Sequence, residues 1–395
     1  MPILNIICNR KMKSLIILGS TGSIGSSTLD IVRNNPGKFD ILALSCGKSV
    51  HKFIEQILEF KPKFATMEDE ILLALVKTKT SHIGVKYISG KNCYDVLLNE
   101  IDNFDCLVGA IPGIAGMIPT LTVMEKCKTL AIANKESVVC AWKFFQEKAR
   151  KLGVKITPID SEHDSLARIM RGILPSDIKK ITLTASGGAF FGYSPEQLES
   201  VKLCDAIKHP NWKMGAKVTI DCATMVNKAL ELMEAVALFN LSYKQVDAII
   251  HRQSIVHAML EENDGSVSAF LAPPDMRLHI LHAISCEDFT PIFPVKSLSL
   301  VEIGRLDFAP IPHDIYKSFY LGLYALKNGQ AMQIIFNSAN EFAVQKFVNE
   351  EAKFTDIPML IDAALSTNFP VNISTIEDIS SLDVMVRKFC SEVKL

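Results

Sequence analysis

Three carboxylates in the sequence have the chemistry and the placement of a metal site. Asp160 and Glu162 flank a serine in the segment Asp160-Ser161-Glu162, which directly follows an apolar run ending at Ile159. If that run is a strand, both side chains extend from its carboxyl end, where open parallel sheets bind ligands. Glu231 lies further along the chain, in a segment of helical periodicity. Ligands that are all carboxylate oxygens favour a hard cation, Mg²⁺ or Mn²⁺, over zinc.

The segment that carries Glu231 has two distinct faces. Asn227, Glu231 and Glu234 follow at spacings of four and three residues, so they share one helical face, with Lys228 beside them. The opposite face is apolar and consists of Val226, Leu230, Met233 and Ala237. The polar face is therefore exposed or functional. The acids could equally be ordinary solvated charges, and spacing alone does not bring Glu231 to Asp160.

A glycine-rich turn near the start of the chain predicts a nucleotide site. The apolar run Leu15–Leu18 leads directly into GSTGSIG, residues 19–25, and then into a helical pattern. Gly19 and Gly22 would let the backbone approach a pyrophosphate, and Gly25 would let helix and strand pack closely. An ordinary glycine-rich turn is the alternative.

The residues directly after the second expected strand favour NADPH as the coenzyme. That position carries Cys46-Gly47-Lys48-Ser49, with no carboxylate to bind a ribose diol. Lys48 could pair with a 2′-phosphate, although it could also be a solvated surface lysine.

Two further polar segments could contact a bound anion. Ser186 lies in Ala185-Ser186-Gly187-Gly188, and Asn227 is followed by Lys228. The segment HPNWKMG, residues 209–215, contains one of the two tryptophans of the chain and is bounded by a proline and a glycine. It could therefore be a lid near residues 205–216 that closes over a substrate. A turn around Ser186 and a surface loop around Trp212 are the alternatives.

The elements that must position these residues predict an α/β protein in several parts. Residues 1–159 alternate apolar runs with helical patterns, which predicts a doubly wound, Rossmann-type parallel sheet. Residues 160–289 read as an α+β catalytic unit, 290–313 as a proline-rich surface linker, and 314–395 as a helical domain. The strands expected in the first part are Leu15–Leu18, Phe39–Leu44, Cys106–Ala110, Thr129–Ala133 and Lys155–Ile159.

Patterns in the later parts are less regular. In the second part we expect apolar runs at Ile181–Thr184, Lys217–Ile220 and Ala248–Ile250, and a helix over Ala223–Phe239. In the last part, polar residues from Asn337 to Asn340 precede apolar positions and indicate a helix start.

Composition excludes several classes of protein. The 42 basic and 43 acidic residues give a formal net charge of −1, so no global field recruits nucleic acid or an anionic membrane. The uncharged stretch from Cys106 to Met124 is interrupted by glycines and prolines, so we do not expect it to span a membrane. Ten scattered cysteines without a CxxC pair suggest reduced thiols and a soluble, cytoplasmic protein. Residues before Met12 are expected to be unstructured, and the start could be Met1 or Met12.

Five motifs together resemble one enzyme family. GSTGSIG at residues 19–25, ANKES at 133–137, DSEH at 160–163, HPNWKMG at 209–215 and NKALE at 227–231 are similar to, and in the order of, the motifs of 1-deoxy-D-xylulose 5-phosphate reductoisomerases. ANEFAV at 339–344 and FTDI at 354–357 extend the similarity into the helical end. The resemblance implies a homodimeric enzyme of the methylerythritol phosphate route to isoprenoid precursors. It would rearrange this sugar phosphate and reduce it with NADPH to 2-C-methyl-D-erythritol 4-phosphate.

The resemblance also implies roles for individual residues. Metal ligands would be Asp160, Glu162 and Glu231, which would also be catalytic together with Lys135. Coenzyme contacts would come from Thr21, Gly22, Ser23, Ile24, Gly47, Lys48, Ser49, Asn134, Glu136 and Gly215. Substrate contacts would come from Lys135, Ser161, Glu162, Ser186, His209, Trp212, Cys222, Asn227, Lys228 and Glu231.

Two positions depart from the family pattern. Cys222 stands where a phosphate-binding serine is usual, and a thiol is the weaker hydrogen-bond donor. Ser49 replaces a common asparagine beside the adenosine phosphate. Substrate phosphate is therefore expected to be held less tightly at Cys222, although Ser186, Asn227 and Lys228 remain, and the resemblance does not by itself imply the coenzyme contact at Ser49.

Two other functions start from the same glycine turn. A semialdehyde-dehydrogenase type of NADP oxidoreductase needs a cysteine nucleophile with a histidine base, and no cysteine here has an identifying motif. An NADP-sensing interaction protein would have no use for the acids. Sensitivity to EDTA would separate the first from a metal-dependent reductoisomerase, and coenzyme oxidation with substrate would exclude the second.

Overall fold

The first part of the chain forms a seven-stranded parallel sheet. The computed structural model describes residues 12–212, 214–285, 295–370 and 372–394; the expectation for the residues before Met12 falls outside this range. The strand order is β4-β3-β2-β1-β5-β6-β7. The strands are β1 (Lys13–Leu18), β2 (Phe39–Ser45), β3 (Phe64–Met67), β4 (Lys86–Ser89), β5 (Phe104–Gly109), β6 (Cys127–Ile132) and β7 (Lys155–Pro158). The predicted doubly wound sheet is confirmed, but β3 and β4, four residues each, were too short to be recognised.

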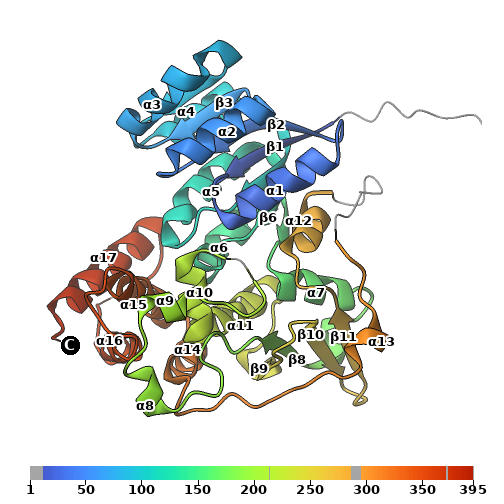
Figure 1. The fold of residues 1–395 in the computed structure, drawn as a ribbon, viewed down its shortest axis with the longest axis vertical. Coiled ribbons are helices and arrows are strands. Elements are labelled where there is room, and N and C mark those ends of the chain that lie inside the picture. The colour runs from blue at the N-terminus through green and yellow to red at the C-terminus, as the bar shows by residue number, and fades with distance from the viewer. Residues whose placement is uncertain (1–11, 213, 286–294, 371, 395) are drawn as a thin grey trace, which may run out of the picture.

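Helices cover both faces of this sheet (Figure 1). They are α1 (Ser23–Asn34), α2 (Val50–Phe60), α3 (Glu70–Thr80), α4 (Cys93–Glu100), α5 (Met117–Val123) and α6 (Lys135–Leu152). The strand order reverses between β1 and β5, which creates the crevice where open α/β sheets bind ligands. Gly19 lies at this crevice with φ +80°, and a Cβ there would come within 2.6 Å of the Ala110 carbonyl oxygen. Glycine is required at this position by both conformation and space.

The second part contains a four-stranded mixed sheet of order β11-β10-β8-β9. Its strands are β8 (Ile178–Ala185), β9 (Val246–Ile250), β10 (Val256–Glu262) and β11 (Val267–Leu271). Its helices are α7 (Ser161–Ile169), α8 (Pro195–Leu198), α9 (Leu203–Ala206), α10 (Ala216–Ala223), α11 (Val226–Phe239) and α12 (Met276–Ser285). Helix α12 packs on α1 of the first part, as Figure 1 also shows.

One helix boundary in the second part was predicted wrongly. The run Lys217–Ile220 is helical, and the helix expected from Ala223 is divided into α10 and α11. Met225 causes the division because its backbone is left-handed, with φ +62°.

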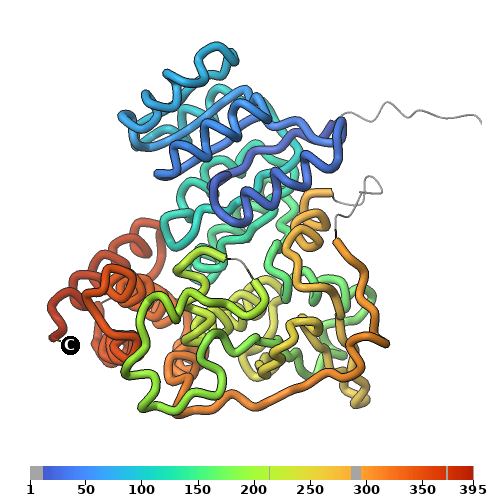
Figure 2. Tube along the Cα trace, in the orientation of Figure 1, coloured from blue at the N-terminus to red at the C-terminus, as the bar shows by residue number. Residues whose placement is uncertain are grey.

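The last part consists of helices. Before it, within the segment expected as a linker, lies a short helix α13 (Leu300–Ile303), and from it an extended segment runs along the lower edge of the view to the first long helix (Figure 2). The four long helices are α14 (Lys317–Asn328), α15 (Gln330–Val348), α16 (Asp356–Leu365) and α17 (Ile376–Glu392). The helix start expected at Asn337–Asn340 is wrong: these polar residues are buried in the middle of α15.

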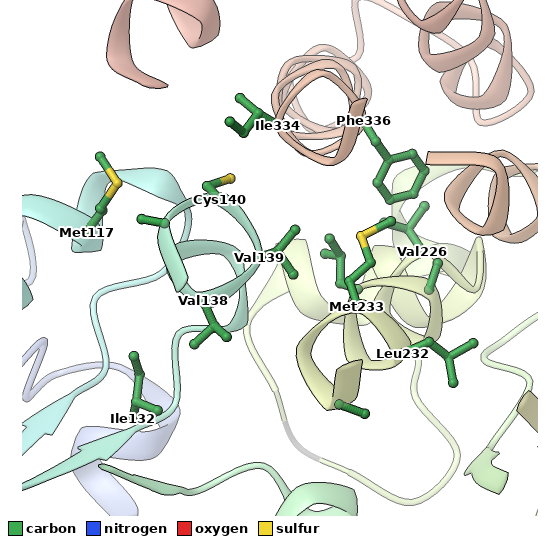
Figure 3. Packing of buried hydrophobic residues seen from close by; sticks show 14 of the residues in the cluster. Met117, Ile132, Val138, Val139, Cys140, Val226, Leu232, Met233, Ile334 and Phe336 are labelled. Carbon is green, nitrogen blue, oxygen red and sulfur yellow. The ribbon is translucent and has the colours of Figure 1, made fainter. Parts of the chain in front are cut away.

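The parts share a continuous apolar core. One cluster of buried side chains extends from the first sheet through α11 to the C-terminal helices. Figure 3 shows Val139 of α6 beside Met233 of α11, with Val226 and Met233 pointing toward Phe336 of α15. A second cluster on the other face of the first sheet includes Ile280 and Ile284 of α12. Burial of this surface stabilises the relative placement of the helices that carry the polar residues of the site.

Two properties of the described residues bear on the expectations from composition. None of their helices combines the length and the apolar character needed to cross a membrane. None of the eight cysteines among them forms a disulfide, and six of them are buried.

Candidate active site

The three acids singled out in the sequence meet at one point. Asp160 precedes α7, Glu162 lies in the first turn of that helix, and Glu231 lies in the middle of α11. One carboxylate oxygen from each lies within 4.8 Å of the others. The packing of α11 against α6 and the second sheet thus brings together groups about 70 residues apart.

Two lysines lie among these acids. Lys135, the first residue of α6, donates through Nζ to Glu231 Oε1 at 2.7 Å and also pairs with Asp160. Lys228 donates to Glu162 Oε1 at 2.6 Å and also pairs with Glu231. The side chains of Lys228 and Glu231 are only 4% and 2% exposed, so these charges depend on one another for compensation.

The surroundings shift the ionisation of these groups in opposite directions. Burial raises the pKa of Glu162 to about 7, aided by the charge of Glu231. Burial also acts to raise the pKa of Asp160, but the ammonium of Lys135 and the ring of His163 outweigh it and hold that pKa well below its usual value. For Lys135 burial favours the neutral form, yet the nearby carboxylates hold its pKa well above the ordinary value. The lysines are cations and Asp160 an anion at neutral pH.

The donor set fits a hard divalent cation. Three carboxylates converge with only two ammonium groups between them, which leaves an excess of one negative charge when Glu162 is ionised. Oxygen ligands of this kind suit Mg²⁺ or Mn²⁺.

A second layer of polar groups supports the acids. His163 is fully buried; its Nε2 lies 2.9 Å from the Glu231 carbonyl oxygen and its Nδ1 lies 3.5 Å from Glu234. Glu234 belongs to the polar face predicted for α11, but it is 1% exposed and faces His163. The acids of that face are therefore buried in the protein, and none is a solvated charge.

A cavity of about 470 Å³ opens beside the acids, within the usual range for small-molecule sites. All ten residues expected to contact substrate line it, as does Asp160. The segment expected as a lid contributes His209, Asn211, Trp212 and Met214 to its wall.

Ser186 and His209 form a polar pair in this wall. Nδ1 of His209 accepts from the backbone N–H groups of Trp212 at 3.0 Å and Asn211 at 3.2 Å. Burial, together with the charge of Arg252, lowers the pKa of His209 to about 4, so the ring is neutral near pH 7. The remaining ring proton must then be on Nε2, which lies 2.9 Å from Ser186 Oγ. Because that oxygen also accepts from the Gly188 N–H at 3.1 Å, its own O–H is left to donate into the cavity.

Of the residues expected to contact coenzyme, Ser23 and Ile24 line the cavity. Ser23 begins α1 directly after Gly22, so the N-terminus of this helix faces the same space as the acids. Thr21 and Gly22 lie in the preceding turn, with Thr21 Oγ1 3.4 Å from Cys46 Sγ.

The other expected coenzyme residues do not line the cavity. Gly47, Lys48 and Ser49 are exposed after β2, and Gly215 caps α10. The side chain of Asn134 caps α6 by accepting from the Ser137 N–H at 2.8 Å, and it donates to the Gly113 carbonyl oxygen at 2.7 Å. Glu136 is buried in an ion pair with Lys217 of α10. In this structure Asn134 and Glu136 are thus engaged in holding elements of the protein together.

Several lining residues were not identified from the sequence. They include Ser254, His257, Met276 and Arg277. Arg277 donates to Asp30 of α1 at 3.0 Å, which joins α12 to the nucleotide-binding part. The run Pro273-Pro274-Asp275 before α12 was a visible helix-start signal, but nothing in it indicated that this helix end would border the cavity.

Comparison with known proteins identifies the family. Sequence profiles described as 1-deoxy-D-xylulose 5-phosphate reductoisomerase, its C-terminal domain, and DXP reductoisomerase C-terminal domain match residues 15–142, 156–239 and 271–389. A reductoisomerase of this name from Bacillus pumilus is 38% identical over 97% of this chain and 100% of its own length. One from Halalkalibacterium halodurans is 40% identical over 96% of this chain and 98% of its own. The chain belongs to the 1-deoxy-D-xylulose 5-phosphate reductoisomerase family.

Solved structures agree with this assignment. A DOX-P reductoisomerase in complex with NADPH, fosmidomycin and magnesium has a TM-score of 0.88 and 35% identity, and covers 96% of this chain and 98% of its own. The reductoisomerase from Zymomonas mobilis in complex with NADPH has a TM-score of 0.86 and 31% identity, with the same coverage. The family resemblance and the α/β architecture expected from the motifs are thereby confirmed.

Proposed function

We propose that this protein converts 1-deoxy-D-xylulose 5-phosphate to 2-C-methyl-D-erythritol 4-phosphate with NADPH and a divalent cation, in the synthesis of isoprenoid precursors. The observation that carries the proposal is the cavity that joins the N-terminus of α1 to the meeting point of Asp160, Glu162 and Glu231. A reductase that also rearranges its substrate needs coenzyme and metal beside the same carbon atoms. Relatives with NADPH and magnesium bound support both cofactors.

We propose that Asp160, Glu162 and Glu231 hold the metal. When bound, a divalent cation supplies Lewis-acid polarisation of a carbonyl and stabilises oxyanion charge, and the coenzyme supplies hydride. Lys135 forms ion pairs with two of the three carboxylates, and its ammonium group lies at the cavity wall. Its raised pKa suits it to stabilise negative charge and makes it a poor general base.

The substrate phosphate is proposed to bind at Ser186, in the wall of the cavity. Ser186 can donate its O–H there because His209 and Gly188 occupy its acceptor positions. Lys228 and Asn227, which line the same cavity, offer a cation and an amide from α11 beside Glu162 and Glu231. Binding energy at the phosphate, distant from the reacting carbons, orients them. Trp212 and Met214, in the wall, would exclude water.

Four features remain part of the proposal. Coenzyme contacts by Thr21, Gly22, Ser23, Ile24, Gly47, Lys48, Ser49, Asn134, Glu136 and Gly215 rest on the family resemblance. The division into residues 1–159, 160–289, 290–313 and 314–395 rests on the strand, helix and proline patterns of the sequence. A homodimer rests on the same resemblance and is tested by light scattering. A cytoplasmic location rests on the absence of disulfides among the described cysteines.

One assay tests the reaction. Loss of NADPH absorbance is followed with 1-deoxy-D-xylulose 5-phosphate in the presence of Mg²⁺, of Mn²⁺, and of EDTA, with the product identified by mass. We expect turnover with either cation and none with EDTA. Turnover that persists in EDTA would contradict the metal role and favour the semialdehyde-dehydrogenase type of chemistry. Coenzyme binding without turnover under every condition would favour an NADP-sensing protein.

A further inference from the structure

A second group of side chains of metal-ligating types lies outside the catalytic cavity, between α7 and α12. Asp164 is in the first turn of α7, and His279 and His282 are three residues apart on α12. Side chains at this spacing share one helical face. Both Nδ1 atoms lie 2.8 Å from Asp164 Oδ2. One candidate ligand atom from each of the three residues lies within 4.8 Å of the others.

The group is buried yet reachable. The side chain of His279 is 0% exposed, while Asp164 and His282 keep 10% and 13%. Nε2 of His279 is buried and has no hydrogen-bond partner among the described residues. Among the described residues the His279 ring thus makes one hydrogen bond, from Nδ1 to Asp164, so ligation through Nδ1 would exchange that one bond for a bond to the ion. A buried polar atom without a hydrogen-bond partner is uncommon in proteins and indicates a bound ion or a functional role for the side chain.

The scaffold fixes the ligands without blocking them. Arg168, one turn further along α7, lies with Nε 3.4 Å from Asp164 Oδ1. This ion-pair contact is to the carboxylate oxygen that does not face the histidines. Both helices are well packed, since α12 contacts α1 and α7, and Ile280 and Ile284 are in the core of the first part. Such support by neighbouring groups is what orients ligands in known metal sites.

We propose that Asp164, His279 and His282 bind a transition-metal ion, with Zn²⁺ as the first candidate, at a site separate from the three-carboxylate site. Two imidazole nitrogens and one carboxylate suit zinc and its neighbours in the first row, whereas Mg²⁺ prefers oxygen. Bonds of about 2.0–2.1 Å in a tetrahedral arrangement place ligand atoms about 3.3 Å apart. The two Nδ1–Oδ2 distances of 2.8 Å would therefore have to widen by about half an ångström, and all three ligand atoms already lie within 4.8 Å of one another.

The position of the site gives it a structural role. At the start of α12, Met276 lines the catalytic cavity and Arg277 pairs with Asp30 of α1. The ring of His279 lies 5.0 Å from that of His257, which also lines the cavity. An ion shared by α7 and α12 would fasten this wall of the cavity to the helix that follows Asp160. Zinc would then raise the melting temperature even without substrate or coenzyme.

The test measures metal binding directly. The full-length protein is stripped with chelator, saturated with Mg²⁺ to fill the carboxylate site, and titrated with Zn²⁺ by calorimetry. We expect one strong site with a Kd at or below about 1 µM, weakened at least about 100-fold in the double variant His279→Gln/His282→Gln. His313→Gln, which removes an exposed histidine of the linker, is the matched control and should bind as the parent does.

Cu²⁺ then serves as a spectroscopic probe. Electron paramagnetic resonance should show coupling to imidazole nitrogen in the parent and in Glu231→Gln, and the coupling should disappear in the double variant. Equal Zn²⁺ affinity in the parent and double variant, or Cu²⁺ without nitrogen coupling, would overturn the proposal and leave a hydrogen-bonded Asp-His-His group. Melting curves without metal show whether the double variant folds; if it does not, His282→Gln alone, at the partly exposed ligand, replaces it. Activity with Mg²⁺ is independent of these outcomes, so the proposed reaction and the proposed site can fail separately.

Discussion

Replacing Glu231 by glutamine tests the centre of the proposed site with the smallest change of shape. Glu231 is the one acid that contacts both lysines: Oε1 accepts from Lys135 at 2.7 Å, and Oε2 accepts from Lys228. Asn227 also donates to Oε1. Glutamine keeps the volume but removes the charge and presents an N–H₂ group to one of these donors.

The expected loss differs between stability and catalysis. Three carboxylates against two ammonium groups carry one net negative charge; the variant has two against two. Lost attraction to the lysines is thus partly offset by relief of repulsion with Glu162 and Asp160. We expect the free energy of unfolding to fall by only about 1–3 kcal/mol. Loss of a metal ligand should lower kcat by at least about 10³-fold, the scale seen when one electrostatic stabiliser of a transition state is removed.

The measurement separates these effects. Turnover is assayed near pH 8, about one unit above the pKa of about 7 for Glu162, so that this acid is ionised. NADPH affinity is followed by quenching of Trp142 and Trp212 fluorescence and should stay within about twofold of the parent, because the turn before α1 lies on a different element. Glu261→Gln, at a partly exposed acid paired with Lys179 on the second sheet, is the matched control. If Glu231→Gln, folded and binding NADPH, keeps a rate within about tenfold of the parent, Glu231 does not hold the metal.

Three other substitutions test the cavity wall and its support. Cys222→Ser should lower the substrate KM or leave it unchanged. The reason is that burial raises the pKa of the Cys222 thiol, which is therefore a neutral, weak hydrogen-bond donor in the cavity wall. A marked rise in the steady-state KM would show that the thiol binds substrate better than a hydroxyl does. Gly188→Ala should lower the free energy of unfolding, measured in urea, by more than about 3 kcal/mol, because φ is +64° and the new Cβ would lie 2.5 Å from the Ala223 backbone. Gly192→Ala is the control: φ is +86° but nothing lies within 4 Å of the new Cβ, so the loss should be about 1 kcal/mol. The pKa of His209 is lowered from 6.5 to about 4, so its contribution to stability is fully present above pH 6.5 and is lost as pH falls toward 4. The difference in free energy of unfolding between the parent and His209→Gln should therefore shrink between pH 6.5 and 4. A constant difference would contradict a neutral His209 ring in the folded protein.

The sequence predicted the parts of this site that depend on local pattern. A strand, a glycine turn and a helix in direct succession predicted β1, the turn at Gly19 and α1, because each is determined by neighbouring residues. The acids could be chosen because an all-oxygen ligand set has a definite chemical preference. Errors occurred where tertiary contacts override local signals. At Asn337–Asn340, polar residues that resemble a helix cap are buried in α15, and Asn340 donates to Asp221 of α10 at 2.9 Å.

The positions of the lysines explain why the rest of the site could not be predicted. Lys135 and Lys228 each pair with an acid that is distant in sequence, Asp160 or Glu162, and both also pair with Glu231 of α11. The pairing of Lys135 with Glu231 is set by the packing of α6 against α11, where Val139 and Met233 meet in the core, whereas Lys228 lies on the same helix as Glu231. A change in that apolar contact would therefore alter the charges of the site without touching a polar residue. The chemistry of the site can be read from residue types, but its charge balance is a property of the hydrophobic core that brings the helices together.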